Sequence, residues 1–262
     1  MTRTSTEPMI TASEELSSAW PSLSPMDLVL IPGLWLDGSS WDAVVPVLER
    51  AGHRTHPLTL PGMDSLDADR SMITLRDHVH AVVAMIDSLD PTNRHVVLVA
   101  HSGGGAIAHA AVDARPDRVE RVVYVDSVPL GDGGNINDQF PAEKGEVPLP
   151  DWLLFDEEDL IDLDDALRER FRQRAIPSPV RVATDPQRLS DCRRYDVPIT
   201  VISTEFPAAM LVKMVEQGDA YVAELAKVRT VDYLDLPTGH WPQFTRPQEL
   251  GQAILTSLGS AS

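Results

Sequence analysis

Cysteine is nearly absent from this sequence: among its 262 residues there is one, Cys192. A single thiol cannot form an intrachain disulfide, so nothing in the sequence favours an oxidising compartment. No apolar run reaches the roughly 18–20 residues that span a bilayer. The first 25 residues also lack the continuous apolar segment of a secretory signal. We therefore expect a cytoplasmic protein in which residues 1–25 form a flexible leader and residues 26–262 form the folded domain.

Basic residues are also scarce, with 22 lysines and arginines against 40 aspartates and glutamates, a net charge of −18. A protein of this charge repels nucleic acid and anionic membrane surfaces, so neither is an expected partner. We expect a neutral or cationic small-molecule substrate and a monomer or homodimer. The acidic run at residues 156–165 lacks the glycine of a calcium-binding loop, and it is typical instead of the start of a helix.

Short apolar segments alternate with amphipathic segments from residue 27 onward, which predicts an α/β fold. Apolar strands separated by helices are typical of a mostly parallel sheet with helices on both faces. The alternation is interrupted at about residues 129–196 by a segment rich in proline, glycine and acidic residues, which we expect to be an inserted lid. Strands are predicted at residues 27–33, 53–63, 95–100, 121–127, 197–203 and 229–236, and helices at residues 39–52, 71–89, 105–116, 163–175, 208–218 and 247–258.

The sequence AHSGG, residues 100–104, joins a predicted strand to a predicted helix. It matches the pattern G-x-S-x-G with Ala100 in place of the first glycine, and its small residues permit the strained turn that exposes a nucleophilic Ser102. The next residue, Gly103, offers its backbone N–H to a developing oxyanion at a helix N-terminus. A second N–H is expected from Leu34, in the loop after the first strand. The stretch therefore predicts a nucleophile beside an oxyanion hole.

The same glycines admit a different hypothesis. Residues 103–108 fit G-x-G-x-x-A, and Asp126 follows Ala108 by 18 residues at the end of the next strand. This arrangement is close to the dinucleotide-binding pattern. That pattern normally opens the first strand–helix unit, whereas two predicted strands precede it here. We favour the nucleophile; NAD retained through purification would support the alternative.

A serine nucleophile needs a base, and His240 is the best placed of the eight histidines. The segment LDLPTGHWPQF puts it in a polar loop between the last predicted strand and the last predicted helix. From about residue 27 onward the sequence resembles the α/β-hydrolase fold family. The resemblance rests on the order and spacing of four segments, PGLWLDGSSW, AHSGGG, VDS and PTGHWPQFTRP. The resemblance is to its esterase, lactonase and hydroxynitrile-lyase members, and it implies a reaction without a metal or organic cofactor.

The resemblance leaves two positions for the acid that orients the histidine. The family usually places the acid after its seventh strand, where this sequence reads VISTEFPAAM and offers only Glu205, about two residues early. Some members, zearalenone-type lactonases among them, place it at the end of the sixth strand, which corresponds to Asp126 in VYVDS. A buried carboxylate is costly unless it is paired, and a histidine partner would explain this one. We favour Asp126 and keep Glu205 as the alternative.

These residues predict a serine hydrolase that cleaves a carboxylic ester or lactone of a small, largely apolar molecule through an acyl-enzyme. Trp35, Trp152, Phe155 and Trp241 are predicted walls of its substrate pocket. Two alternatives use the same fold. One is a small-molecule sensor with little turnover, and the other is a lyase whose histidine transfers a proton without an acyl-enzyme.

Overall fold

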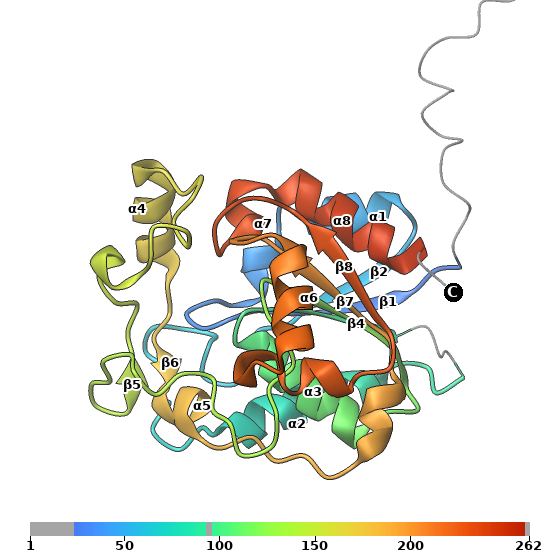
Figure 1. Cartoon of the computed structure of the whole chain (residues 1–262). Helices are drawn as coiled ribbons and strands as arrows, with labels where there is room; N and C mark the ends of the chain where they lie inside the picture. The colour runs from blue at the N-terminus through green and yellow to red at the C-terminus, as the bar shows by residue number, and fades with distance from the viewer. Residues whose placement is uncertain (1–23, 93–95, 260–262) are drawn as a thin grey trace, which may run out of the picture.

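The computed structural model describes residues 24–92 and 96–259, so nearly all of the predicted leader lies outside the described residues. A six-stranded parallel sheet forms the centre of the molecule, in the order β2-β1-β3-β4-β7-β8 (Figure 1). The predicted α/β fold with a parallel sheet is confirmed. The strands are β1 (Asp27–Ile31), β2 (Arg54–Pro57), β3 (Val96–His101), β4 (Val119–Val125), β7 (Ile199–Ser203) and β8 (Val231–Asp235).

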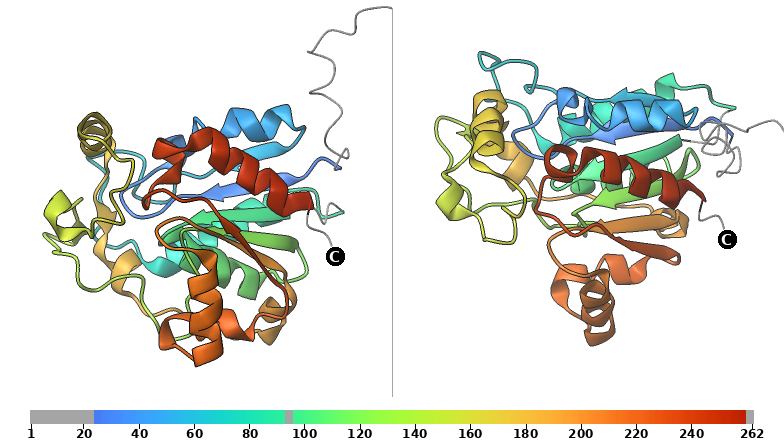
Figure 2. Two further views of the ribbon diagram at one scale, coloured as in Figure 1. Left: turned by 45° about the horizontal axis from the view of Figure 1, so that its top comes forward. Right: turned by 90° about the horizontal axis from the view of Figure 1, so that it is seen from above.

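Helices cover both faces of the sheet because its central strands are apolar on both sides (Figure 2). Side chains alternate along a strand, so Leu28 and Leu30 of β1 enter one hydrophobic cluster while Val29 and Ile31 enter another. The first cluster is closed by α1 (Val45–Arg50) and α8 (Pro247–Gly259). The second is closed by α2 (Leu75–Ser88), α3 (Gly104–Ala114) and α6 (Ala208–Gln217).

Two elements near the N-terminus are shorter than predicted. The strand expected at 53–63 ends at Pro57, which has no N–H to donate, and this edge strand is only partly buried. The helix expected at 39–52 is divided into a 3-10 turn, Gly38–Trp41, and α1. Pro46 stands in the first turn of α1, where its missing N–H does no harm; further inside a helix it would break the hydrogen-bond ladder.

The segment between β4 and β7, residues 129–196, holds a small two-stranded antiparallel sheet and short helices. Its acidic run leads into α4, where the Asp164 carboxylate accepts the Leu167 N–H at 2.8 Å and so caps the helix. The segment contacts the loop after β1, since the Ile176 N–H donates to the Trp35 carbonyl at 3.0 Å. Its regular elements are β5 (Glu146–Val147), a 3-10 turn (Trp152–Leu154), α4 (Asp165–Arg174), β6 (Ser178–Pro179), α5 (Val180–Thr184) and a 3-10 turn (Cys192–Asp196).

Three short elements complete the described part of the chain: 3-10 turns at Ala220–Val222 and Leu225–Lys227, and α7 (Pro242–Thr245) directly after the last strand's loop. Among the described helices, none combines the length and the apolar character needed to cross a bilayer.

Candidate active site

Ser102 lies on the sharp turn between β3, which ends at His101, and α3, which begins at Gly104. Ser102 has a φ of 51°, a left-handed conformation that costs free energy for a residue with a side chain and that is concentrated at functional sites. A Cβ on Gly104 would lie 2.6 Å from the carbonyl oxygen of Pro32. Only glycine therefore lets the turn approach the loop after β1 this closely.

His240 lies between Ser102 and Asp126. Its Nε2 is 2.8 Å from Ser102 Oγ, and its Nδ1 is 2.6 Å from Asp126 Oδ2. Ser102 follows β3, Asp126 follows β4, and His240 lies in the loop after β8. The carboxyl ends of these parallel strands lie at the same edge of the sheet. When Nδ1 donates its proton to Asp126, Nε2 is left free to accept the proton of the Ser102 hydroxyl. The structure thus joins three of the predicted residues in one chain of hydrogen bonds.

Asp126 is held as a carboxylate by its partners. Burial alone would raise its pKa, but the hydrogen bond and positive charge of His240 outweigh this and lower the pKa to about 2. The Thr204 N–H also donates to Asp126 Oδ1, at 3.3 Å. In return, and against the opposing effect of burial, the Asp126 carboxylate raises the pKa of His240. The pair therefore favours the positively charged imidazole that forms when the histidine takes a proton.

Glu205, the alternative acid, lies beside the same nitrogen. Its Oε1 is 3.0 Å from His240 Nδ1, yet this buried oxygen forms no hydrogen bond among the described residues, because the single Nδ1 proton points to Asp126. Burial is the main cause that raises the pKa of Glu205 to about 8, and the Asp126 charge and a contact with Asp159 also raise it. His240 acts in the opposite direction and lowers this pKa. The shorter, hydrogen-bonded contact favours Asp126 over Glu205.

The donor atoms of Asp126, Glu205 and His240 lie within 4.8 Å of one another, which makes them a conceivable metal-ligand set. Two ligands of a tetrahedral zinc ion, each about 2.0–2.1 Å from the metal, are roughly 3.3 Å apart. The 2.6 Å between His240 Nδ1 and Asp126 Oδ2 is too short for that geometry and fits a charge-assisted hydrogen bond. The arrangement therefore suits an oriented histidine better than a metal centre.

The backbone N–H groups of Gly103 and Leu34 have no hydrogen-bond partner among the described residues. The two residues lie close together, since a Cβ on Gly103 would be 3.5 Å from Leu34 Cγ. Trp35, at a φ of 64°, turns the loop and donates its own N–H to Ser178 Oγ at 2.8 Å. Leu34 and Gly103 both line a cavity that Ser102 also lines. Their N–H groups are therefore available to bind an oxyanion there.

His101 supports the loop that carries His240. Burial holds the pKa of His101 at about 3, so its ring is neutral. Its Nε2 donates to the His240 carbonyl oxygen at 2.7 Å, and its Nδ1 accepts from Gln243 Nε2 at 3.2 Å. The His240 N–H donates in turn to the Asp159 carbonyl at 2.8 Å. The backbone of His240 is thus fixed on both sides.

Ser102, Asp126 and His240 open into a cavity of about 740 Å³. Of the three tryptophans predicted as pocket walls, only Trp35 lines it, together with Phe140 and Phe155. The prediction for Trp152 and Trp241 is wrong. Trp241 is 1% exposed and packs against His240, with ring centroids 5.0 Å apart, and Trp152 packs on Trp241 at 5.8 Å. Trp241 and Trp152 thus belong to an aromatic cluster that packs against the His240 ring.

One end of the same cavity is polar, and no sequence motif predicts it. Glu224 lines it and is 4% exposed; its carboxylate accepts from His109 Nε2 at 3.0 Å, Arg194 Nε at 3.1 Å and Lys227 Nζ at 2.9 Å. Tyr221 also lines the cavity. These residues come from separate segments with no shared motif, so only the folded chain brings them together.

The glycines after Ser102 serve close packing, which removes the support for the dinucleotide hypothesis. A Cβ on Gly105 would lie 2.2 Å from Ser127 Oγ, and that hydroxyl donates to the Ser102 carbonyl at 2.7 Å. Asp126, which would have to bind a ribose, is engaged by His240. The turn is therefore built around the serine.

Comparison with known proteins agrees with this geometry. Residues 28–253 match the model of the alpha/beta hydrolase family, and the chain belongs to that family.

Among its relatives, the chain is 33% identical over 102 residues to a pyrethroid hydrolase of Sphingobium wenxiniae, covering 39% of this chain and 36% of the relative. It is 35% identical over 101 residues to methylesterase 7 of Arabidopsis thaliana, covering 37% and 38%. The matched segments thus span only about a third of either curated relative. Over the whole fold, a methylesterase structure from Arabidopsis superposes with a TM-score of 0.71 at 17% identity, covering 90% of this chain and 100% of that one.

Proposed function

We propose that the protein is a serine hydrolase that cleaves a carboxylic ester or lactone of a small, largely apolar molecule. The observation that carries the proposal is the chain of hydrogen bonds Ser102–His240–Asp126, with separations of 2.8 and 2.6 Å. Relatives that are named methylesterases and a pyrethroid hydrolase support esters as the substrate class.

The mechanism follows from the position of each group. Ser102 Oγ attacks the acyl carbonyl while His240 Nε2 takes its proton, and Asp126 stabilises the resulting imidazolium. The N–H groups of Gly103 and Leu34 bind the oxyanion of the tetrahedral intermediate. His240 then protonates the leaving alkoxide, which leaves an acyl group on Ser102. Water, deprotonated by His240, hydrolyses this ester and restores the enzyme.

The cavity supports a substrate with an apolar portion. Trp35, Phe140 and Phe155 form an aromatic wall with ring centroids 5.1–6.1 Å apart. A volume of about 740 Å³ is ample for a small ester. In this proposal residues 129–196, which supply Phe140 and Phe155, act as the lid that sets specificity.

The proposal is tested by steady-state hydrolysis of p-nitrophenyl esters of increasing acyl length, together with aryl-substituted esters and lactones. We expect turnover by the wild type, a preference for apolar acyl groups over acetate, and loss of turnover in Ser102→Ala and His240→Ala. Turnover that persists in Ser102→Ala would contradict a serine nucleophile. Folded wild-type protein without turnover on the panel would favour the sensor alternative.

A further inference from the structure

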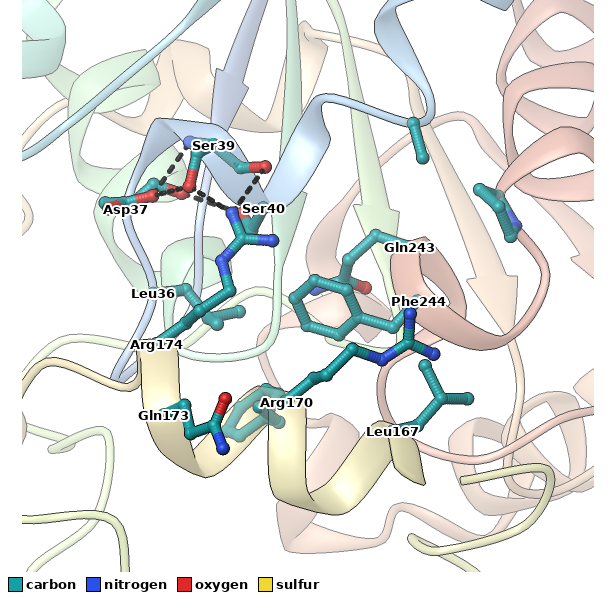
Figure 3. A pocket seen from close by; sticks show the side chains of 13 residues that line it. Leu36, Asp37, Ser39, Ser40, Leu167, Arg170, Gln173, Arg174, Gln243 and Phe244 are labelled. Atoms are coloured by element: carbon teal, nitrogen blue, oxygen red, sulfur yellow. Dashed lines mark hydrogen bonds between the residues drawn. The ribbon is translucent and has the colours of Figure 1, made fainter. Parts of the chain in front are cut away.

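A second cavity, of about 310 Å³, lies between α4 and the loop after β1, next to α7 (Figure 3). None of the residues that line it lines the catalytic cavity. Its size is at the lower end of the range for small-molecule sites. Its lining includes Leu36, Ala43, Arg170, Phe171, Arg174 and Phe244.

The interior of this cavity is apolar. Phe171 and Phe244 meet edge to face, with ring centroids 5.4 Å apart, and Leu36 and Leu167 belong to the same hydrophobic cluster. Removing an apolar group from water against such a surface is favourable in proportion to the area buried. The walls therefore suit the hydrocarbon part of a ligand.

Two arginines of α4 extend over the cavity from one face of the helix, four residues apart (Figure 3). Arg170 donates from Nε to the Ala166 carbonyl at 3.4 Å, and Arg174 donates from Nη2 to Ser39 Oγ at 2.6 Å. Neither has a carboxylate partner among the residues that the structure describes. The one carboxylate of the cavity, Asp37, accepts the Ser39 N–H at 2.8 Å as the cap of its own turn, and it also accepts the Ser39 hydroxyl. Ser39 Oγ therefore lies between Asp37 and Arg174.

Arg170 and Arg174 are exposed and make no direct ion pair with a carboxylate among the described residues. The sequence of α4, DALRERFRQR, has four arginines against two acids, so the helix is locally basic. Guanidinium groups bind carboxylates with charge-assisted and often bidentate hydrogen bonds. Two guanidinium groups at the rim of an apolar cavity therefore indicate a ligand with an anionic head on an apolar body.

We propose that this cavity is a second ligand site, which binds small amphipathic carboxylates with the apolar body on Phe171 and Phe244 and the carboxylate on Arg170 and Arg174. The site lies close to the catalytic centre. The Phe171 ring contacts Trp241 at 5.1 Å, and Trp241 contacts His240 at 5.0 Å, so a ligand on Phe171 is two ring contacts from the candidate base.

Isothermal titration calorimetry with octanoate tests the proposal, with octanamide as the uncharged analogue. We expect octanoate to bind the wild type and octanamide to bind at least about tenfold more weakly, because the uncharged amide cannot form charge-assisted hydrogen bonds with the guanidinium groups. Arg170→Gln and Arg174→Gln should each weaken octanoate binding by about the same factor. Both arginines are exposed, so these variants keep the packing of α4.

Two further variants locate the binding. Ala43→Trp, at an exposed position on the cavity wall, should abolish octanoate binding by filling the space. Arg168→Gln, the same charge change on the same helix but outside the cavity lining, should leave it unchanged. Absence of octanoate binding to the wild type, equal binding of octanamide, or binding that survives Ala43→Trp would overturn the proposal. The titration needs no turnover, so its failure is distinct from a failure to hydrolyse esters.

Discussion

At the scale of single residues, two carboxylates compete for one imidazole nitrogen. Asp126 Oδ2 is 2.6 Å from His240 Nδ1 and forms the hydrogen bond, whereas Glu205 Oε1 is 3.0 Å away and forms none. Only one proton is present on Nδ1, so one carboxylate must be the orienting group. The geometry therefore favours Asp126, which follows β4, over Glu205, which follows β7, as the group that orients His240.

The substitution Asp126→Asn should reduce kcat by about 10³–10⁴-fold, because an amide N–H facing Nδ1 favours the wrong histidine tautomer. Glu205→Gln should reduce kcat by less than about tenfold, because Glu205 holds its own proton at neutral pH and does not orient the ring. Steady-state kinetics on one ester measures both. A larger loss in Glu205→Gln than in Asp126→Asn would assign the acid to Glu205.

Glu205 should also make stability depend on pH. Its folded pKa is raised to about 8, so between its ordinary value and pH 8 the folded state keeps a proton that the unfolded chain releases. The free energy of unfolding should therefore fall as pH rises from about 5 to about 8.

Urea titrations at several pH values across this range measure that change. In Glu205→Gln the decrease should be smaller, since no buried carboxyl group remains to ionise at this position. Parallel pH profiles for the two proteins would show that Glu205 titrates normally in the folded state.

At the scale of elements, the turn after β3 and the loop after β1 must touch for the site to form. Gly104→Ala places a methyl group 2.6 Å from the Pro32 carbonyl oxygen, so one of the two segments has to move. We expect a loss of about 1–3 kcal/mol in the free energy of unfolding, as for other overpacked sites, and a lower kcat because Leu34 moves with the loop. Urea denaturation and ester kinetics measure the two effects.

The matched control for this substitution is Gly259→Ala at the end of α8. A Cβ at that position has no neighbour within 4 Å, so stability and kcat should stay close to the wild type. Equal behaviour of the two alanine variants would mean that the turn tolerates a side chain at Gly104.

The elements were largely predictable from sequence because each central strand is a short apolar run between turn residues. β3 was expected at residues 95–100 and lies at Val96–His101. The edge strand β2 was overestimated because the segment 53–63 continues with apolar residues that pack as irregular chain, such as Leu58 and Leu60 in the second cluster.

The candidate site was predictable only in part. Ser102, Gly103 and His240 belong to short sequence motifs, which can be recognised without knowing the fold. The contact between Asp126 and His240 joins residues 114 positions apart, so the choice of acid needed the fold. Trp241 was misjudged because apolarity is shared by pocket walls and by buried cores, and its 1% exposure places it in the core.

At the scale of the whole molecule, the net charge of −18 should change the rate at which charged substrates reach the protein. A strongly negative protein attracts cationic molecules over distances up to the Debye length, about 10 Å at 0.1 M salt. For an ester with a quaternary ammonium group, kcat/KM should fall as salt rises from about 0.01 to about 0.5 M. For a neutral ester of the same shape it should stay constant, and equal salt dependence of the two would rule out long-range steering.

Covalent labelling with a serine-reactive probe shows whether Ser102 is a nucleophile activated by His240. Wild-type protein, Ser102→Ala and His240→Ala are treated with a fluorophosphonate, and the intact mass of each is measured. We expect one adduct on the wild type, none on Ser102→Ala, and a strongly slowed reaction in His240→Ala. Folded wild-type protein that takes up no adduct, or an adduct that persists in Ser102→Ala, would contradict this expectation.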